Sequence, residues 1–147
     1  MAGQEHLYLA AITALRADAA LVTLTGHTAT SFRIARASPP VKGRSPFLGV
    51  LIPQSLPLVG KDCTRLQQAE LDFYCHGSEL QSLRIADRVE VILNPETTVA
   101  SYWDFSDTNV SVRQSRFRSR QGPMHDEASD IWSVLVVADI VWINESC

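Results

Sequence analysis

The sequence lacks the features that mark secreted, disulfide-bonded and membrane proteins. Its three cysteines, Cys63, Cys75 and Cys147, are an odd set without a Cys-x-x-Cys pair, so they indicate neither a disulfide framework nor a zinc site. The chain does not open with a charged segment followed by an apolar signal core, so we expect intracellular, reducing synthesis. The longest apolar run, residues 131–143, contains a serine and an aspartate and is shorter than the ~20 residues that span a bilayer. No membrane segment is expected.

Catalytic motifs are missing as well. The sequence has no glycine-rich phosphate loop, no Gly-x-Ser-x-Gly elbow, no paired zinc ligands and no aromatic platform for stacking bases. An enzyme is therefore the weakest functional class, and no cofactor and no metal are expected. Catalytic residues that are scattered in sequence can still meet in a fold, so this class stays open.

What is present is typical of one globular domain spanning residues 1–147. Hydrophobic residues make up 46% of the 147 and charged residues 20%. The formal charge of -3 weighs against non-specific nucleic-acid binding as the main task. Lysine occurs only at Lys42 and Lys61, and arginine supplies the other basic groups. Because arginine suits planar pairing with carboxylate or phosphate, this usage favours interfaces.

Helix signals occur in two parts of the chain. An apolar face recurs through residues 4–16, and Asp18 is placed to cap one or two further turns that stop at Gly26. The motif Ser78-Glu79-Leu80-Gln81 is a capping box, which predicts a second main helix from Glu79 to the stop at Asn94-Pro95. Its predicted core-facing stripe is Leu80, Leu83, Ala86, Val89 and Leu93, widened by Ile85 and Ile92.

The remaining segments are β-patterned. Pro39, Pro40 and Pro46 make residues 37–46 a loop, and Pro53 is expected to end the strand that begins at Phe47. The predicted strands are residues 28–35, 47–52, 65–76, 98–105, 110–120 and 131–143. The last three are most economically joined as an antiparallel meander. The predicted class is α+β, with an antiparallel, mostly meander sheet of about five or six strands and two packed helices.

The feature most suggestive of a binding function is a row of arginines, Arg113, Arg116, Arg118 and Arg120. Regular alternation would place the last three on one strand face. Such a face can meet carboxylates of a neighbouring subunit, or line a channel where arginine contacts DNA phosphates without reading sequence. A solvated strand face is the equally weighted alternative.

Two loops carry the remaining candidate contact residues. The proline loop presents Lys42 and Arg44, and the loop predicted at residues 121–130 presents Asp126 and Glu127, which are able to pair with arginines across a subunit boundary. His125 precedes these carboxylates, and this arrangement permits metal binding or acid–base chemistry. Adjacent residues seldom converge on one metal, so a solvated loop is the favoured interpretation.

The run at residues 131–143 is apolar on both faces when it is read as a strand. Trp132 and Trp142 share one side, and the opposite side carries Asp139 as its one charge. A strand of this kind requires cover on both sides. A helix layer can supply one cover and a neighbouring subunit the other, although a purely intramolecular sandwich is the alternative.

The order of these elements resembles a known family. "ALRADAALVTLTG" is followed by "SPFLGVLIP", then "QQAELDFYCHG" feeds directly into "SELQSLRIADRVEVIL", and "VSVRQSRFRSR" and "DIWSVLVVADIVWI" close the chain. Residues 7–143 thus resemble the tail terminator and tail-completion proteins of long-tailed bacteriophages and of phage-derived gene transfer agents. The strand-Gly-Ser-helix junction and the final tryptophan-bearing strand carry the resemblance.

The resemblance implies a structural virion protein rather than an enzyme. Members of this family are α+β domains that form a ring, usually of six subunits, which caps the tail tube at the head–tail junction. The implied partners are copies of the chain, the tail tube protein and a neck or head-completion protein, with DNA passing through the lumen without sequence-specific binding. We expect residues 38–45, 113–120 and 121–130 to supply the contacts.

Three rival functions remain open. The nearest is a neck or head-completion protein, that is, a head–tail connector that binds the portal side instead of the tube. A rival of another class is a small anion-binding regulatory domain that uses the arginine strand. The third is a hydrolase centred on His125.

Overall fold

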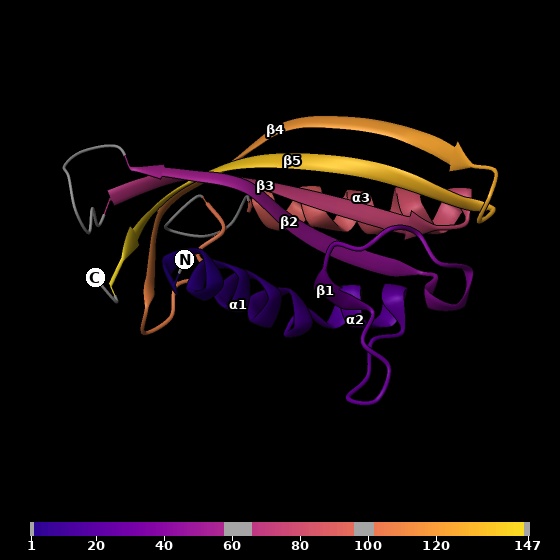
Figure 1. Ribbon diagram of the computed structural model, residues 1–147, viewed down its shortest axis with the longest axis horizontal. Coiled ribbons are helices and arrows are strands. Elements are labelled where there is room, and N and C mark those ends of the chain that lie inside the picture. The colour runs from indigo at the N-terminus through magenta and orange to yellow at the C-terminus, as the bar shows by residue number, and fades with distance from the viewer. Residues whose placement is uncertain (1, 58–65, 96–101, 146–147) are drawn as a thin grey trace.

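A computed structural model describes residues 2–57, 66–95 and 102–145, in which five strands form one sheet that carries the helices (Figure 1). In chain order the elements are α1 (Ala2–Arg16), α2 (Ala19–Thr25), β1 (Ile34–Arg36), the 3-10 turn η1 (Lys42–Arg44), β2 (Phe47–Pro57), β3 (Leu66–Gly77), α3 (Glu79–Leu93), β4 (Val110–Asp126) and β5 (Ile131–Asn144). The α+β class is confirmed. The sequence predicted two packed helices, and α2 adds a short third one.

The capping signals of the sequence act as predicted. The Asp18 carboxylate accepts a hydrogen bond from the backbone N–H of Leu21 at 3.0 Å, and Gly26 ends α2 in the left-handed region at φ 72°. Ser78 and Gln81 form both hydrogen bonds of the capping box, and α3 begins at Glu79. These termini are correct because capping depends on residues within one helical turn.

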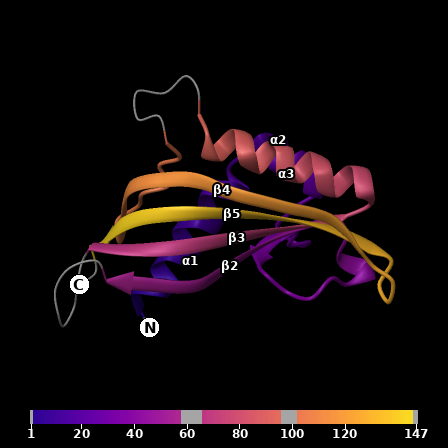
Figure 2. The ribbon, with the colours of Figure 1, turned by 90° about the horizontal axis from the view of Figure 1, so that it is seen from above.

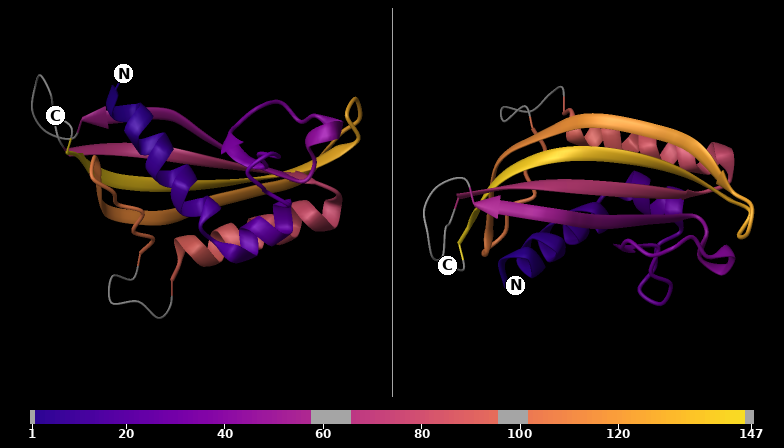
Figure 3. Two further views of the ribbon diagram at one scale, coloured as in Figure 1. Left: turned by 90° about the horizontal axis from the view of Figure 1, so that it is seen from below. Right: turned by 45° about the horizontal axis from the view of Figure 1, so that its top comes forward.

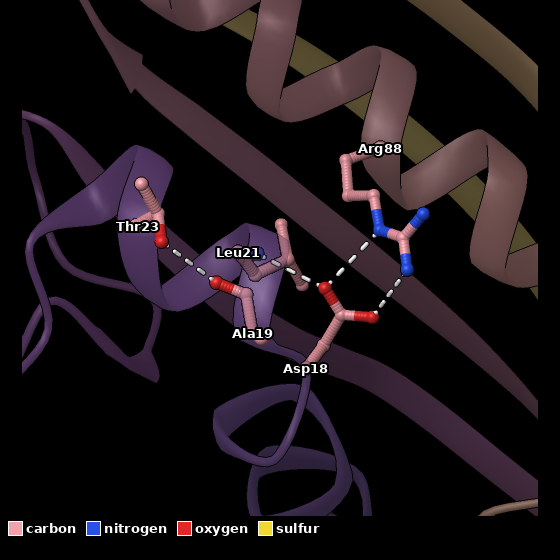
Figure 4. Close-up of polar contacts among 5 residues, drawn as sticks. All are labelled: Asp18, Ala19, Leu21, Thr23 and Arg88. Atoms are coloured by element: carbon pink, nitrogen blue, oxygen red, sulfur yellow. Dashed lines mark hydrogen bonds and ion pairs between the residues drawn. The ribbon is translucent and has the colours of Figure 1, made fainter.

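Asp18 also joins α2 to α3 (Figure 4). The guanidinium of Arg88 donates from Nε to Oδ1 at 3.1 Å and from Nη2 to Oδ2 at 2.7 Å. This pairing lowers the pKa of Asp18, against a smaller opposing effect of burial. One carboxylate therefore both begins a helix and fixes it beside its neighbour.

The buried face of α3 agrees with the predicted stripe at Ile85, Ala86, Val89 and Leu93 and differs from it at Leu80. It runs through Ser82, Ile85, Ala86, Val89 and Leu93, and the Ser82 hydroxyl donates to the Glu79 carbonyl at 2.8 Å. Leu80, predicted to face the core, is 55% exposed. At about 100° per residue it lies roughly 140° around the helix from Ile85, outside the buried stripe.

The sheet is mixed, so the predicted antiparallel meander is wrong. Its order is β1-β2-β3-β5-β4, with β1 parallel to β2 and the other pairs antiparallel. The last strand, β5, lies between β3 and β4 because its apolar residues are best buried at the centre, and β4 becomes an edge. Of the strand predicted at residues 98–105, residues 98–101 lie outside the described part and residues 102–105 form no strand. The Trp103 backbone instead bonds the Ser115 hydroxyl, at 2.8 Å through its N–H and 3.0 Å through its carbonyl.

Two strands run further than the sequence predicts. β2 continues past Pro53 to Pro57, with a register shift between Leu51 and Gln54. β4 continues to Asp126, and its register with β5 shifts at several places, one of them around Pro123. The loop predicted at residues 121–130 is therefore reduced to a turn at residues 127–130. The extra residue of a β-bulge makes no hydrogen bond to the neighbouring strand, so proline is tolerated there. For this reason neither strand ends at its proline.

All three helices lie on the same side of the sheet (Figures 2 and 3). Phe73 and Trp142 are fully buried between the sheet and the helices, in one cluster with residues of α1 and α3. The other side of the sheet, hereafter the open face, carries none of the described helices (Figure 3, right). Among the described helices, none alone is long and apolar enough to cross a membrane; α1 and α2 meet that test only when joined across their 85° bend.

Candidate functional site

The open face is built from alternate residues of four adjacent strands. Asp72 of β3 is in register with Leu51 of β2 and Val137 of β5, and Asp139 of β5 is in register with Glu70 and Arg116. Directly opposed residues of a sheet share a face. The open face therefore combines apolar side chains with a charged group formed by Glu70, Asp72, Arg116, Arg118 and Asp139.

Arg118 lies between two acids of this charged group. Its guanidinium forms an ion pair with Glu70 of β3 and another with Asp139 of β5 at 3.1 Å. The sequence predicted carboxylate partners for this arginine in a neighbouring subunit, whereas two of its partners belong to its own chain. Glu70 and Asp139 were not singled out as site residues, although the polar side of β3 and the lone charge in β5 were visible in the sequence.

Asp72 is the unusual acid of the open face. It is 7% exposed, and its Oδ1 has no hydrogen-bond partner among the described residues. Burial, followed by the hydrogen bond and charge of Glu70, raises the pKa of Asp72 to about 7. The pKa of Glu70 is lowered, first by the hydrogen bond that Asp72 donates and then by Arg118. The two carboxyl groups thus share one proton near neutral pH.

Arg120 lies on the opposite side of the sheet, so the predicted single row of Arg116, Arg118 and Arg120 is wrong. It forms ion pairs with two acids of α3, Asp87 at 2.7 Å and Glu90 at 2.8 Å. The register passes from Phe117 opposite Ala138 to Ser119 opposite Val137, so Arg118 is an inserted bulge residue. A bulge reverses the alternation that follows it.

The other two arginines of β4 are Arg113 and Arg116. Both side chains are exposed, and within the described part of the chain neither has a hydrogen bond or an ion pair. Arg116 is in register with Asp139 on the open face, and Arg113 occupies the register shift between Val112 and Gln114. These two cations at the sheet edge are available to a partner.

The proline loop closes one end of the open face. At Gly49 an added Cβ would lie 2.7 Å from the Cα of Ala37, so glycine allows the loop to pass close to the sheet. The Ala37 N–H donates to the Val50 carbonyl at 2.8 Å. The Arg44 guanidinium lies 4.6 Å from the ring centre of Phe47. The side chain of Lys42, the other predicted contact residue here, lies outside the described part.

His76 of β3 lies beside this loop. Its Nδ1 is 2.6 Å from the Ser133 hydroxyl of β5, and burial lowers its pKa while an interaction with the Ser38 backbone partly opposes that effect. An apolar hollow of about 300 Å³ opens between loop and sheet, lined by Ala37, Ser38, Pro39, Pro40, Leu51, Tyr74 and His76. The His76 ring therefore joins β3 to β5 through Ser133 and lines this hollow, and its Nε2 has no hydrogen-bond partner among the described residues.

The turn between β4 and β5 holds the predicted acidic residues at this same end of the sheet. Asp126 accepts a hydrogen bond from the Ser129 hydroxyl at 2.6 Å, which lowers the pKa of Asp126. Glu127 is exposed and has no partner among the described residues. His125 lies 2.8 Å from Asp130. In the described ranges no group of three or more His, Cys, Asp and Glu side chains is placed to hold a metal.

Comparison with known proteins finds a likeness of fold. Neither a protein-family model nor a curated protein matches the sequence. A chain of the virion of a native gene transfer agent (GTA) particle has a similar fold. The TM-score is 0.60 at 14% identity, over 93% of this chain and 96% of that chain. At this identity the likeness concerns the fold.

Proposed function

We propose that this protein is a structural component of a bacteriophage or gene-transfer-agent particle, and that it acts there as the tail terminator. The observation that carries the proposal is the fold shared with a GTA virion chain over nearly the whole length of both chains. The order of elements in the sequence resembles the tail terminator family independently of that likeness.

The proposed mechanism is geometric. A ring of copies, six in the resembled family, caps the tail tube at the head–tail junction and stops its growth, while its other side binds the neck. A ring needs head-to-tail contacts between unlike surfaces of each copy. The chain offers such unlike surfaces in its β4 edge and its open face, and the proline loop and the β4–β5 turn lie together at one end of the sheet (Figure 1).

The charged groups favour this structural role over the two chemical rivals. Arg118 and Arg120 form ion pairs with carboxylates of their own chain, which weakens the case both for an anion-binding domain and for an arginine-lined DNA channel. His125 contacts Asp130 and the Trp132 ring within the described part, without a second acid or a nucleophile. A non-enzymatic role follows as part of the proposal.

Deletion of the gene from its phage or gene transfer agent tests the proposal. Loss of a tail terminator should leave heads unjoined to tails, with tails of irregular length, and complementation with the intact gene should restore joined particles. Label attached to the protein should appear at one axial position, where the tail meets the head. Normal, joined particles from the deletion would overturn the proposal. Tails of normal length with defective heads would instead assign the protein to the neck.

A further inference from the structure

The described helices cover only one side of β5. Val134, Val136, Ala138, Ile140 and Trp142 are buried beneath them. On the open face Ile131 and Val137 are buried, Leu135, Val141 and Ile143 are half-buried, and the described part of the chain supplies no helix to cover them. A sheet face of this composition in the middle of a five-stranded sheet is typical of an interface.

Charge is unevenly distributed over the same face. Its centre carries three carboxyl groups, those of Glu70, Asp72 and Asp139, against the single guanidinium of Arg118. Its β4 edge carries Arg113 and Arg116 without partners in the described part of the chain. Because Glu70 and Asp72 share one proton near neutral pH, the centre has a surplus of one negative charge, and the two arginines of the edge have no ion pair in the described part of the chain.

We infer that the open face is covered by a second copy of this chain, with the β4 edge of one copy resting on the β3–β5 centre of the next. Arg116 of one copy then pairs with the Glu70–Asp139 group of its neighbour, and the half-buried apolar residues of β5 lose their remaining exposure between the two copies. A copy of the chain fits because it carries both halves of the charge pattern, and charge complementarity sets orientation. The inference specifies which surfaces meet in the proposed ring. It rests on the proposed function in one respect, namely that copies of the chain assemble.

Joining through strand edges is the less suitable geometry. β4 is an edge strand of 17 residues, but its register with β5 shifts at three places and it contains Pro123. The opposite edge, β1, has three residues. Bulges, proline and exposed charge are the devices that prevent strands from pairing edge to edge. When the β4 edge of one copy lies on the open face of the next, no hydrogen bonding between edge strands is needed.

Nucleic acid is a poor occupant for the open face. Phosphates would meet Glu70 and Asp139 directly, and Arg118 is already engaged by both. Like charges that face each other across an interface disfavour binding. A DNA strand in a lumen would be better placed against another surface of the ring.

Charge reversal in the purified full chain tests the inference. We expect Arg116→Glu to weaken self-association at least ~10-fold by sedimentation velocity, since it places a fourth acid on the acidic centre of the neighbour. Asp139→Arg should weaken it similarly, and an equimolar mixture of the two variants should recover assembly. Arg84→Glu is the matched control, because Arg84 is exposed on α3 at the helix side. Circular dichroism and thermal unfolding verify that each variant is folded.

Cross-linking supplies a readout that does not depend on affinity. Cys63 and Cys147 are replaced by serine, after which one chain carries Arg116→Cys and a second carries Asp139→Cys; the remaining Cys75 is buried. Mild oxidation of the mixture should join the two chains by a disulfide. A mixture of Arg84→Cys with Asp139→Cys should stay largely unjoined.

The results separate this inference from the proposed function. If the chain forms rings and joins tails to heads, but Arg116→Glu assembles normally and the 116–139 cross-link is missing, the interface lies elsewhere and the function stands. If the cross-link forms while the protein is lacking from particles, the interface stands and the function fails. A chain that stays monomeric at high concentration overturns the inference.

Discussion

Arg118 and Arg120 lie two residues apart on β4, yet they make their ion pairs on opposite sides of the sheet. Arg118 meets Glu70 and Asp139 on the open face, whereas Arg120 meets Asp87 and Glu90 of α3. The bulge at Arg118 separates them. One strand thereby supplies a charge to the candidate interface and another to the attachment of a helix.

Arg120→Gln should destabilise the fold, because it leaves the two acids of α3 facing each other without a cation. Since Asp87 is largely exposed and Glu90 is not, we expect a loss of about 1 kcal/mol in the free energy of unfolding by urea. Arg113→Gln is the matched control, as Arg113 has no partner in the described chain, and should change stability by less than ~0.5 kcal/mol. Equal losses in both variants would contradict the assignment of Arg120.

Asp72→Asn should alter how stability depends on pH. The folded pKa of Asp72, about 7, is raised above its ordinary value of 3.8. Between these values the folded state holds a proton that the unfolded state has lost, so this group's contribution to stability falls as pH rises, until both states are ionised. Asparagine does not ionise and can still donate to Glu70. The stability of the variant relative to wild type should therefore increase from pH 5 to pH 8, as measured by urea unfolding, and a constant difference would contradict the raised pKa.

Asp18→Ala should remove both the cap of α2 and the partner of Arg88. We expect a loss of ~1–2 kcal/mol in the free energy of unfolding. Asp18→Asn retains a capping oxygen but loses the ion pair, so its loss should be smaller. Chemical denaturation of the two variants separates the contributions, and an equal loss would show that the cap contributes little.

Gly49→Ala should displace the proline loop from the sheet. Its Cβ would lie 2.7 Å from the Cα of Ala37, and backbone cannot give way as a flexible side chain does. We expect destabilisation of ~1–3 kcal/mol. Gly43→Ala lies in the same loop region with open space around the added Cβ, so thermal unfolding should show it close to wild type. Similar melting temperatures for both variants would contradict a close approach at Gly49.

Much of the fold was predictable where the determining residues are near one another in sequence. Asp18, Gly26 and the capping box at Ser78 gave correct helix ends, and residues 131–143 gave a correct strand. The alternation of residues in β3 also separates its two faces, with Phe73 and Cys75 toward the core and Asp72 away from it. Each of these patterns depends on spacing within one element.

The candidate site was predictable only in part. Arg116 and Arg118 were identified as exposed strand residues, and whether they serve assembly stays a prediction. The side of Arg120 was missed, because a bulge leaves no mark in a regular alternation of Arg and Ser. Glu70 and Asp139 were missed as partners, because pairing between strands that are 69 residues apart (70 to 139) depends on which strands become neighbours.

By itself, the sequence determined where helices begin and end, which strand is apolar on both faces, and that arginine is concentrated in one segment, since these properties depend on local hydrogen bonding and side-chain spacing. Tertiary structure decided the strand order, the parallel β1–β2 pair, the bulges of β4 and the side of the sheet left uncovered. The physical reason is that these features minimise exposed apolar surface and unpaired backbone groups over the whole chain at once. No segment carries that information alone.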